Sequence, residues 1–305
     1  MAKKSPADAG YGAQVGATLA VMAAACLFGT LPFFARTLSE HGLAPQAISF
    51  WRFVLSALVL TPFVIFGRPQ PRPLLWALAG GAAMGLGWIG FVTALRELSV
   101  AETGILFMTF PLFAILIGWL LFGERPQFWG VIAGLLIMAA ALAVAPPGRW
   151  AGNLGAALGH ALLAPAAYGF LLNIVARKLS ALRPPAAAGA VALGSVMVVA
   201  PLLAGLQMDE VLPHSADAWG WLLLFSGATA LLPQLLVVMF AAKIGATRTA
   251  IAGSLELPAM FLVGTLALGE TLAPHHLFAA VLILLAIVLS ARPSHDAQAF
   301  SRSGP

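Results

Sequence analysis

Long apolar stretches, separated by short segments that hold charged residues, proline or glycine, recur along the whole chain. A helix needs about 20 apolar residues to cross a bilayer, and the chain contains ten stretches of roughly that length. The connecting segments are short, and only 208–217, with three acidic residues, has any length. The pattern predicts ten transmembrane helices, at residues 14–36, 46–67, 73–95, 100–122, 127–146, 152–175, 186–206, 218–241, 247–268 and 273–291.

The composition fits a chain whose solvent is lipid. Hydrophobic residues make up 61% of the sequence, charged residues make up 9%, and the mean hydropathy is +0.95. A soluble domain usually carries about a quarter charged residues. The basic residues are dispersed among the loops instead of forming a stripe, which argues against nucleic-acid binding. We therefore expect an all-α integral membrane protein without a soluble domain.

The distribution of basic residues predicts an orientation. With the N-terminus in the cytoplasm, twelve of the sixteen Lys and Arg residues lie on the cytoplasmic side and three lie outside, while Arg52 lies within a helix. An excess of Lys and Arg marks the cytoplasmic side of a membrane protein. We expect cytoplasmic tails at 1–13 and 292–305, and a multi-pass protein of a bacterial-type inner membrane.

The two halves of the sequence resemble each other. Segment 94–124 contains Pro111 and ends in "FGE", while segment 241–270 contains Pro258 and ends in "LGE". In the same way, "ARTLS" at 35–39 corresponds to "ARKLS" at 176–180.

Five spans per repeat is an odd number, so the second repeat enters the membrane upside down relative to the first. We expect a first repeat at 14–146, with helices 1–5, and a second at 152–291, with helices 6–10. Inverted repeats are typical of alternating-access carriers, whose binding site lies near the midplane between the repeats.

Several motifs in this order resemble the EamA type of the drug/metabolite transporter (DMT) superfamily. They are "FWRF" at 50–53, "FGE" at 122–124 with "WG" at 129–130, and "LELP" at 255–258 followed by "LGE". The resemblance covers the chain from about residue 16 to residue 289 and implies ten helices with both termini cytoplasmic. It also implies a central cavity lined mainly by helices 1, 3, 4, 6, 8 and 9, and the export of amino acids, metabolites or toxic organic compounds. The second repeat departs from the pattern because "HHLFAA" replaces its "WG".

Glu256 is the most informative polar residue, because it lies midway along a predicted span. A carboxylate there costs several kcal/mol unless it is neutralised, paired or wetted. Pro258 removes a backbone donor two residues later and opens a local polar spot. Glu256 is a candidate for proton coupling or for binding a cationic group of a substrate. The alternative is a carboxyl that braces helix packing.

Arg52 could hold a substrate carboxylate through its guanidinium fork. We prefer the alternative, in which Arg52 lies near the outer end of its helix and its side chain reaches the headgroups or a loop. A pair between Arg52 and Glu256 stays open. Glu102, Glu124 and Glu270 each precede or begin a predicted helix, and we expect them to stabilise the positive N-terminal ends of these helices.

Four further residues and two prolines complete the candidate set. His160 could carry a proton, although a single histidine more often serves packing. Trp88, Tyr168 and Gln234 lie deep in helices that the resemblance assigns to the cavity wall, where an aromatic surface with few polar groups would suit a partly apolar substrate. Pro111 and Pro258 are candidate bend points for gating.

The function that these features favour is secondary transport of a small organic molecule, and we expect export. No nucleotide-binding motif is present, so a gradient must drive the flux; protons are one candidate, and passive facilitation is equally compatible. An intramembrane enzyme is the main alternative, but no G-x-S-x-G, no H-E-x-x-H and no aspartate occurs within the predicted spans. A passive channel is the third possibility. We expect no cofactor and no metal, with lipid and a small molecule as partners, and a monomer suffices although a dimer stays open.

Overall fold

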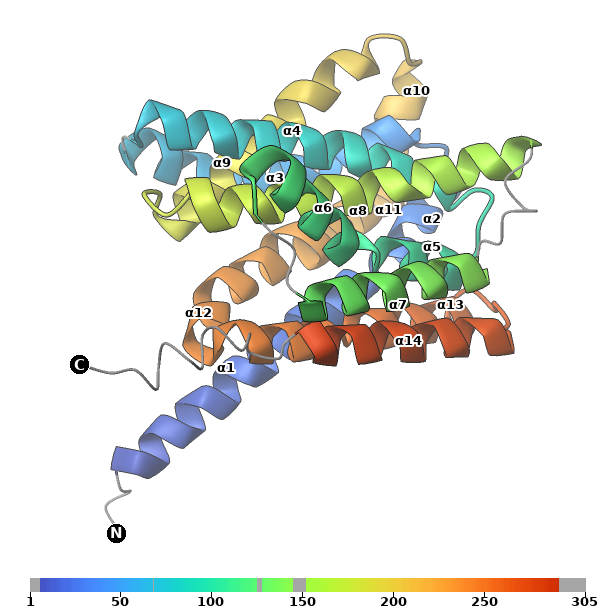
Figure 1. The fold of residues 1–305 in the computed structure, drawn as a ribbon. Helices are drawn as coiled ribbons and strands as arrows, with labels where there is room; N and C mark the ends of the chain where they lie inside the picture. The colour runs from blue at the N-terminus through green and yellow to red at the C-terminus, as the bar shows by residue number, and fades with distance from the viewer. Residues whose placement is uncertain (1–5, 68, 125–127, 145–151, 291–305) are drawn as a thin grey trace, which may run out of the picture.

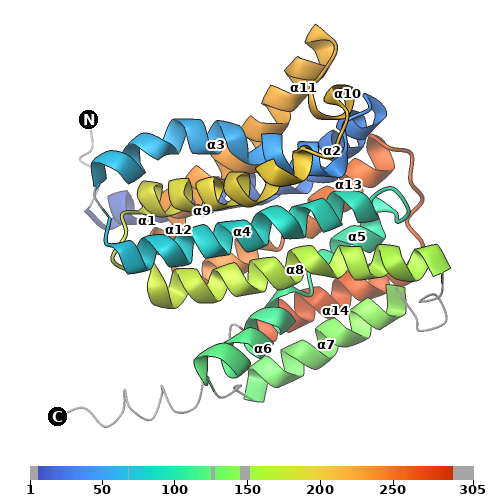
Figure 2. The same ribbon diagram turned by 90° about the horizontal axis from the view of Figure 1, so that it is seen from above.

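The computed structural model describes residues 6–67, 69–124, 128–144 and 152–290. Every regular element in these ranges is a helix, as the composition predicts (Figures 1 and 2). The predicted tail 292–305 lies outside the described residues, whereas the first helix already begins within the predicted tail 1–13. The elements are α1 (Pro6–Gly29), α2 (Leu31–Glu40), α3 (Pro45–Gly67), α4 (Pro71–Ala94), α5 (Val100–Phe107), α6 (Phe110–Phe122), α7 (Phe128–Val144), α8 (Gly152–Lys178), α9 (Pro184–Val199), the 3-10 helix η2 (Ala200–Leu203), α10 (Met208–Val211), α11 (Ala216–Ser226), the π-helix η3 (Gly227–Leu231), α12 (Leu232–Gly253), α13 (Glu256–Leu266) and α14 (Pro274–Ser290).

The helices account for the predicted spans, with differences in length. Seven helical stretches in the described residues are long and apolar enough to cross a membrane. Three shorter apolar helices, Phe128–Val144, Glu256–Leu266 and Pro274–Leu289, accompany them. Each of these ten stretches overlaps one of the ten predicted spans.

Three predicted spans are broken at or near a proline. The first span divides into α1 and α2, and Pro32 is the second residue of α2. The fourth span divides into α5 and α6, and the ninth is divided by the break between α12 and α13. Proline has no N–H, so it cannot donate the backbone hydrogen bond that would continue a helix through its position. Pro111 and Pro258 are accordingly the second and third residues of α6 and α13.

The loop that separates the predicted eighth and ninth spans is absent from the structure. Residues 242–246 belong to α12, which runs without interruption from Leu232 to Gly253. The prediction of a loop rested on the positive charge in this stretch, but the segment contains no proline, and its alanines favour helix. The expected boundary is therefore wrong, and α12 joins the two spans.

Helices from the two halves of the sequence pack against each other. The main partners are α4 with α8 and α9, α3 with α9, α1 with α12, and α7 with α14. Small residues permit the closest approach, since a side chain at Gly81 would lie 1.9 Å from the carbonyl oxygen of Val191. The Ser195 hydroxyl donates a hydrogen bond to the Gly81 carbonyl at 2.7 Å, which ties α9 to α4. Close packing of small residues is typical of helices within membranes.

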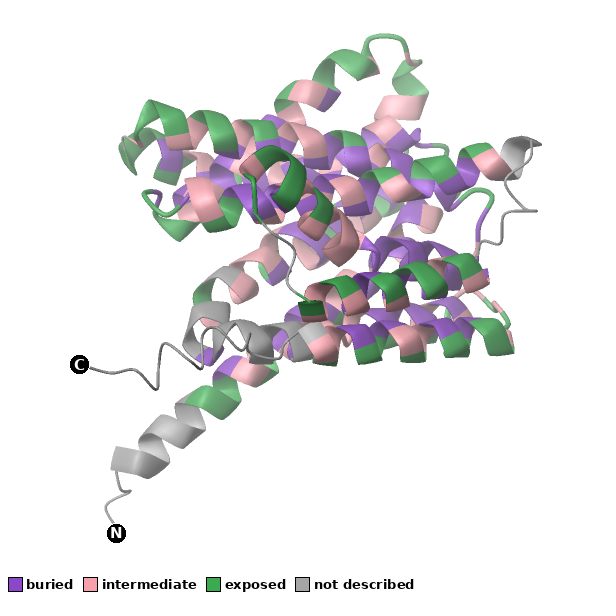
Figure 3. Cartoon of the chain, viewed as in Figure 1, coloured by how far each residue is buried: buried purple, intermediate pink, exposed green. Residues whose placement is uncertain are grey.

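Large apolar side chains cover the outside of the protein. Phe66 and Leu266 are 83% and 82% exposed, and Phe128 is 72% exposed. In Figure 3 the outward faces of α7 and α14 are largely exposed, while buried residues gather on the faces between helices. An apolar surface of this extent is expected where lipid is the solvent. The chain is therefore described as a multi-pass membrane protein.

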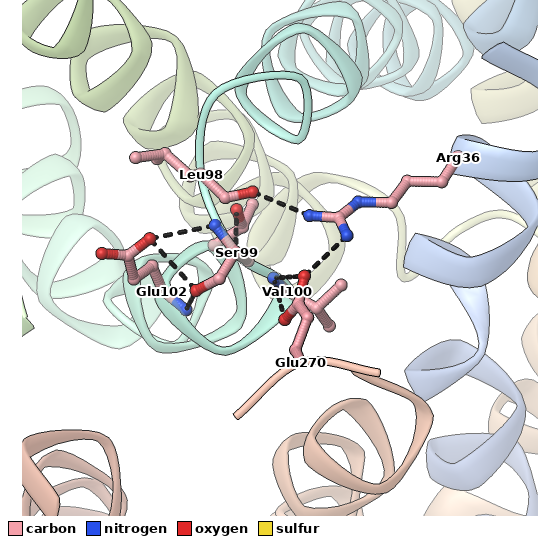
Figure 4. A network of polar contacts seen from close by, with 7 residues as sticks. Arg36, Leu98, Ser99, Val100, Glu102 and Glu270 are labelled. Carbon is pink, nitrogen blue, oxygen red and sulfur yellow. Dashed lines mark hydrogen bonds and ion pairs between the residues drawn. The ribbon is translucent and has the colours of Figure 1, made fainter. Parts of the chain in front are cut away.

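A polar network ties the two halves together at one end of the helices (Figure 4). Glu270 pairs with Arg36 at 2.6 Å and accepts a hydrogen bond from the Val100 backbone N–H at 2.8 Å. Arg36 also donates a hydrogen bond to the Leu98 carbonyl at 3.0 Å. Glu270 thus stabilises the N-terminus of α5, in the other half of the chain, rather than the following helix as we predicted. The reason is the folding of α13 against α5, which the sequence does not show.

Glu102 behaves as predicted at the same helix start. Its carboxylate accepts a hydrogen bond from the Ser99 backbone N–H at 2.9 Å, and the Ser99 hydroxyl accepts one from the Glu102 N–H at 3.1 Å. This reciprocal arrangement is a capping box. Two carboxylates therefore meet the positive end of α5, which has only eight residues.

A related pair lies at the opposite end of the helices. Arg177, at the end of α8, forms an ion pair with Glu124 and donates a hydrogen bond to Asn173 Oδ1 at 2.6 Å. Arg36 and Arg177 are the arginines of the two "AR" motifs, and Glu124 and Glu270 end the two "GE" motifs. Each pair therefore joins an arginine of one half to a glutamate of the other.

Candidate functional site

A cavity of about 220 Å³ lies between the two halves of the chain. That space would hold about seven water molecules, so it suits a small metabolite. Its walls come from α1, α3, α4, α5, α8, α9, η3, α12 and α13. The lining residues are Phe28, Arg52, Phe53, Ser56, Leu60, Met84, Trp88, Phe107, Tyr168, Leu171, Leu172, Val175, Ala188, Val191, Ala192, Thr229, Ala230, Gln234, Val237 and Glu256.

The cavity extends from the middle of the helices toward one end. Leu60 and Val175 lie in the C-terminal halves of α3 and α8, and Ala188 lies in the first turns of α9. These ends lie on the same side of the protein in Figure 2. The other end of the helices is filled by the main hydrophobic core, which includes Leu38 and Val100. The site is therefore closed at the end that carries the Arg36–Glu270 network.

Arg52 lies at the closed part of the cavity. Its side chain is 3% exposed, so it does not reach out toward the headgroups as we predicted. Its Nη2 donates a hydrogen bond to the Thr229 carbonyl at 2.7 Å, and its Nε donates one to the Thr229 hydroxyl at 3.3 Å. The inward position follows from these acceptors, which η3 supplies from a part of the sequence 177 residues away.

Thr229 is available to Arg52 because the helix widens around it. Residues Gly227–Leu231 form a π-helix between α11 and α12. Such single-turn bulges commonly occur at functional sites. The Thr229 hydroxyl also donates a hydrogen bond to the Phe225 carbonyl at 2.8 Å, which fixes its oxygen as an acceptor for Arg52.

Aromatic rings form one wall of the cavity. The Arg52 guanidinium carbon lies 3.8 Å from the centre of the Trp88 ring, a distance at which cation–π attraction is strong. Phe107 lies 5.4 Å from Trp88 and 5.8 Å from Tyr168 between ring centres. Trp88 is 4% exposed and belongs to the main hydrophobic core. It also lines the cavity, so it serves both packing and the site.

Glu256 begins α13 and is partly buried in the cavity wall. No ion pair within 4.0 Å joins it to Arg52 in the described part of the chain, although both line the same space. The Glu102 and Glu270 carboxyls have backbone hydrogen bonds, whereas the described residues contain no hydrogen bond to the Glu256 side chain. The cavity thus contains one basic and one acidic side chain, and within the described residues no ion pair or hydrogen bond joins them.

The comparisons with known proteins give the family. The sequence pattern of the EamA-like transporter family matches the chain twice, at residues 15–145 and 155–292. The chain belongs to the EamA-like transporter family. The resemblance to this family in the sequence motifs is therefore confirmed, and the protein is a transporter of the DMT type.

Solved structures share the fold of this EamA-family chain. Seventeen solved chains match, and one crystal structure of a protein covers 95% of this chain and 99% of its own length, with a TM-score of 0.61. The two sequences are 18% identical, so the likeness concerns the fold alone. No curated protein matches the chain.

The structure brings together most of the residues that the sequence proposed for this EamA-family site. Glu256, Trp88, Tyr168, Gln234 and Arg52 all line the cavity.

Three of the candidates lie elsewhere. His160 is exposed on α8 and is not part of the cavity wall. Pro111 and Pro258 lie beside helix breaks and do not line the space.

Sequence reasoning missed two parts of the wall. Helices 2 and 7, which correspond to α3 and α9, contribute seven of the twenty lining residues. Ser56 and Thr229 were also missed. The spacing of Ser56, one helical turn after Arg52, was a usable signal, whereas nothing in the sequence places Thr229 beside Arg52.

Proposed function

We propose that this EamA-family protein is a secondary transporter that moves a small organic molecule across the inner membrane by alternating access. The observation that carries the proposal is the small cavity between the two halves, closed at one end and lined by Arg52, Glu256 and aromatic rings. Carriers built from inverted repeats bind their substrates at such an interface near the midplane. The proposal includes ten membrane crossings, in repeats at 14–146 and 152–291.

The open end of the cavity lies on the side from which an exporter loads its substrate. The cavity extends toward the end where α8 finishes and where α4 and α9 begin. Arg72, Arg177, Lys178 and Arg183 lie at that end, which the positive-inside rule assigns to the cytoplasm. On that assignment both termini are cytoplasmic and the structure is inward-facing. An exporter loads its substrate in this conformation and an importer releases it, so the proposal of export rests on the family and not on this conformation.

Glu256 is the residue we propose for coupling. A carboxyl inside a membrane helix is commonly part of a substrate or proton pathway. With no ion pair in the described residues, Glu256 can change its protonation state without breaking a protein contact. Proton exchange and passive facilitation differ only in whether this step is linked to substrate movement.

Counterflow in proteoliposomes tests the transport proposal. Purified protein is reconstituted with an unlabelled metabolite inside, and uptake of the labelled compound is followed for a panel of amino acids and small organic acids. We expect saturable uptake of at least one compound, and acceleration by a pH gradient if protons are coupled. Liposomes without protein and the variant His160→Gln, outside the cavity, are the controls. Breakdown of a panel compound without saturable uptake would favour an intramembrane enzyme and contradict the proposal.

A further inference from the structure

Two buried polar atoms, on residues that line the cavity, have no hydrogen-bond partner. Within the described residues, Arg52 Nη1 and Ser56 Oγ are the side-chain N or O atoms that are shielded from solvent and unpaired. Arg52 and Ser56 are 3% and 5% exposed and lie one helical turn apart on α3. Buried polar groups in proteins are nearly always hydrogen-bonded. Two exceptions side by side in one cavity indicate where the polar atoms of a ligand bind.

The guanidinium of Arg52 is held with one edge already occupied. Thr229 accepts hydrogen bonds from Nε and Nη2, and the Trp88 ring lies against the guanidinium at 3.8 Å. These contacts fix the plane of the guanidinium, so the direction of the Nη1 donors is set before a ligand arrives. No carboxylate of the described residues lies within ion-pair distance of Arg52. A charge inside a membrane helix normally has a partner.

We propose that Arg52 Nη1 and Ser56 Oγ form a carboxylate-binding subsite that selects the substrates of the transporter. The N–H donors of Nη1 next to a hydroxyl donor match the two oxygens of a carboxylate, which accepts charge-assisted hydrogen bonds. The inference rests on the proposed function, because the subsite belongs to the same cavity. It also narrows that function, which by itself leaves amino acids, other metabolites and drug-like compounds equally open.

The rest of the cavity defines the other parts of the substrate. Glu256 brings a carboxyl group into the same space, and its ionised form disfavours a dianion and favours a substrate with a compensating amino group. Phe53, Met84 and Leu171 supply an apolar surface for a hydrocarbon side chain. A zwitterion with a branched apolar side chain, such as leucine, combines these features within the available volume.

Binding to the purified full chain in detergent tests the subsite separately from transport. Isothermal titration compares leucine with leucinamide, which lacks the carboxylate, and with 4-methylpentanoate, which lacks the amino group. We expect leucine to bind about tenfold or more tightly than leucinamide, since a buried donor left unpaired is costly. We expect 4-methylpentanoate to bind more weakly than leucine by a smaller factor.

Two matched serine variants of α3 test the residues. Ser56→Ala removes a subsite donor. Ser49→Ala is the control, because Ser49 is the other buried serine one turn from Arg52. The Ser49 hydroxyl donates a hydrogen bond to the Gly85 carbonyl at 2.9 Å, and Ser49 does not line the cavity. We expect Ser56→Ala to reduce the preference for leucine over leucinamide by about threefold to tenfold, and Ser49→Ala to leave it unchanged. Arg52→Gln should abolish the preference. Because Arg52→Gln also loses its bonds to Thr229 and could fail to fold, the serine pair decides.

The outcomes separate the two proposals. If leucine does not bind, if leucine and leucinamide bind equally, or if Ser56→Ala and Ser49→Ala keep the same preference as wild type, the subsite is wrong. Saturable counterflow of compounds without a carboxylate would then leave the transporter proposal standing. Carboxylate-dependent binding without any flux would support the subsite and contradict the transport proposal.

Discussion

Two of the three broken spans, those broken near Pro111 and Pro258, differ in the polar residue that precedes the proline. In the first half, Thr109 lies two residues before Pro111; in the second, Glu256 lies two residues before Pro258. Thr109 is 3% exposed, and its hydroxyl donates a hydrogen bond to the Leu106 carbonyl at 2.6 Å. Glu256 lines the cavity, and its side chain has no hydrogen bond within the described residues. The helix break before the proline therefore has a hydrogen-bonded hydroxyl in the first half, whereas in the second half it has a carboxyl without a hydrogen bond among the described residues.

The first break is surrounded by packed side chains, whereas the second opens onto the cavity. α5 is buried along its whole length, and its break is packed by the rings of Phe107 and Phe110, whose centres lie 5.9 Å apart. At the second break the carboxyl of Glu256 opens onto a space that Arg52 and Gln234 share. Both halves of the chain therefore have the helix break, whereas the cavity-lining acid is present at the break of the second half alone.

We expect the largest effect on folding when a glutamate, the residue type of the second break, replaces Thr109 in the first break. Thr109→Glu puts a carboxyl into a filled core that offers no cavity, and a charged residue at the centre of a membrane helix costs about 3 kcal/mol. The reciprocal change, Glu256→Thr, removes a charge from a space that can accommodate the smaller side chain. We expect Thr109→Glu to abolish monodisperse protein in size-exclusion chromatography and Glu256→Thr to retain it. Equal yields of monodisperse Thr109→Glu and Glu256→Thr protein would contradict the claim that the first break is filled and the second opens onto a cavity.

The prolines are expected to have the next largest effect. Pro258→Ala supplies an N–H that can extend α13 toward Gly253 and move Glu256, so both the apparent affinity and the maximal rate should fall, by about tenfold for each 1.4 kcal/mol of lost interaction. Pro111→Ala alters a bend without touching the cavity, so the maximal rate alone should fall, by about threefold. Concentration-dependent counterflow measures the two parameters. If Pro111→Ala left transport rates unchanged, the gating role of the first break would be wrong.

The smallest effects are expected at the glutamates after the two broken helices. Gly123 and Gly269, with φ of 70° and 67°, turn the chain at the ends of these helices and place Glu124 and Glu270. Glu270→Gln weakens an ion pair and a helix N-terminal contact, which should lower the stability by about 1 kcal/mol. Glu124 is 59% exposed, and an exposed pair contributes about 0–1 kcal/mol, so Glu124→Gln should cost less. Thermal unfolding in detergent measures both, and a larger loss for Glu124→Gln would reverse the ranking.

Much of the fold follows from the sequence because apolar length is a strong signal. Ten stretches, the internal repeat and the family can be predicted from runs of hydrophobic residues and a few motifs. The missing loop within α12 could not be predicted in this way, since Lys and Arg mark a membrane face but do not end a helix. The same limit applies to Glu270, whose contact with the N-terminus of α5 depends on tertiary packing.

The site could be predicted only in part. Glu256, Trp88, Tyr168 and Gln234 were found because polar or large aromatic residues are unusual deep in apolar helices. Arg52 was assigned to the lipid interface because its position along the helix permits that, and only the contact with Thr229 shows that it turns inward. His160 was named for its residue type alone, with packing as the preferred interpretation, and it lies exposed on α8 outside the cavity wall.

The most direct test of the central claim, that the second break carries the site while the first serves as scaffold, is counterflow with two near-isosteric variants. Thr109→Val removes the hydroxyl of the first break at a cost of about 1 kcal/mol in stability, and Glu256→Gln removes the charge of the second. We expect Thr109→Val to keep the wild-type rate within about twofold and Glu256→Gln to lower it by about a hundredfold, the factor that 2.7 kcal/mol of lost interaction produces. If both folded variants transport alike, or if Thr109→Val is the more impaired, the account is wrong.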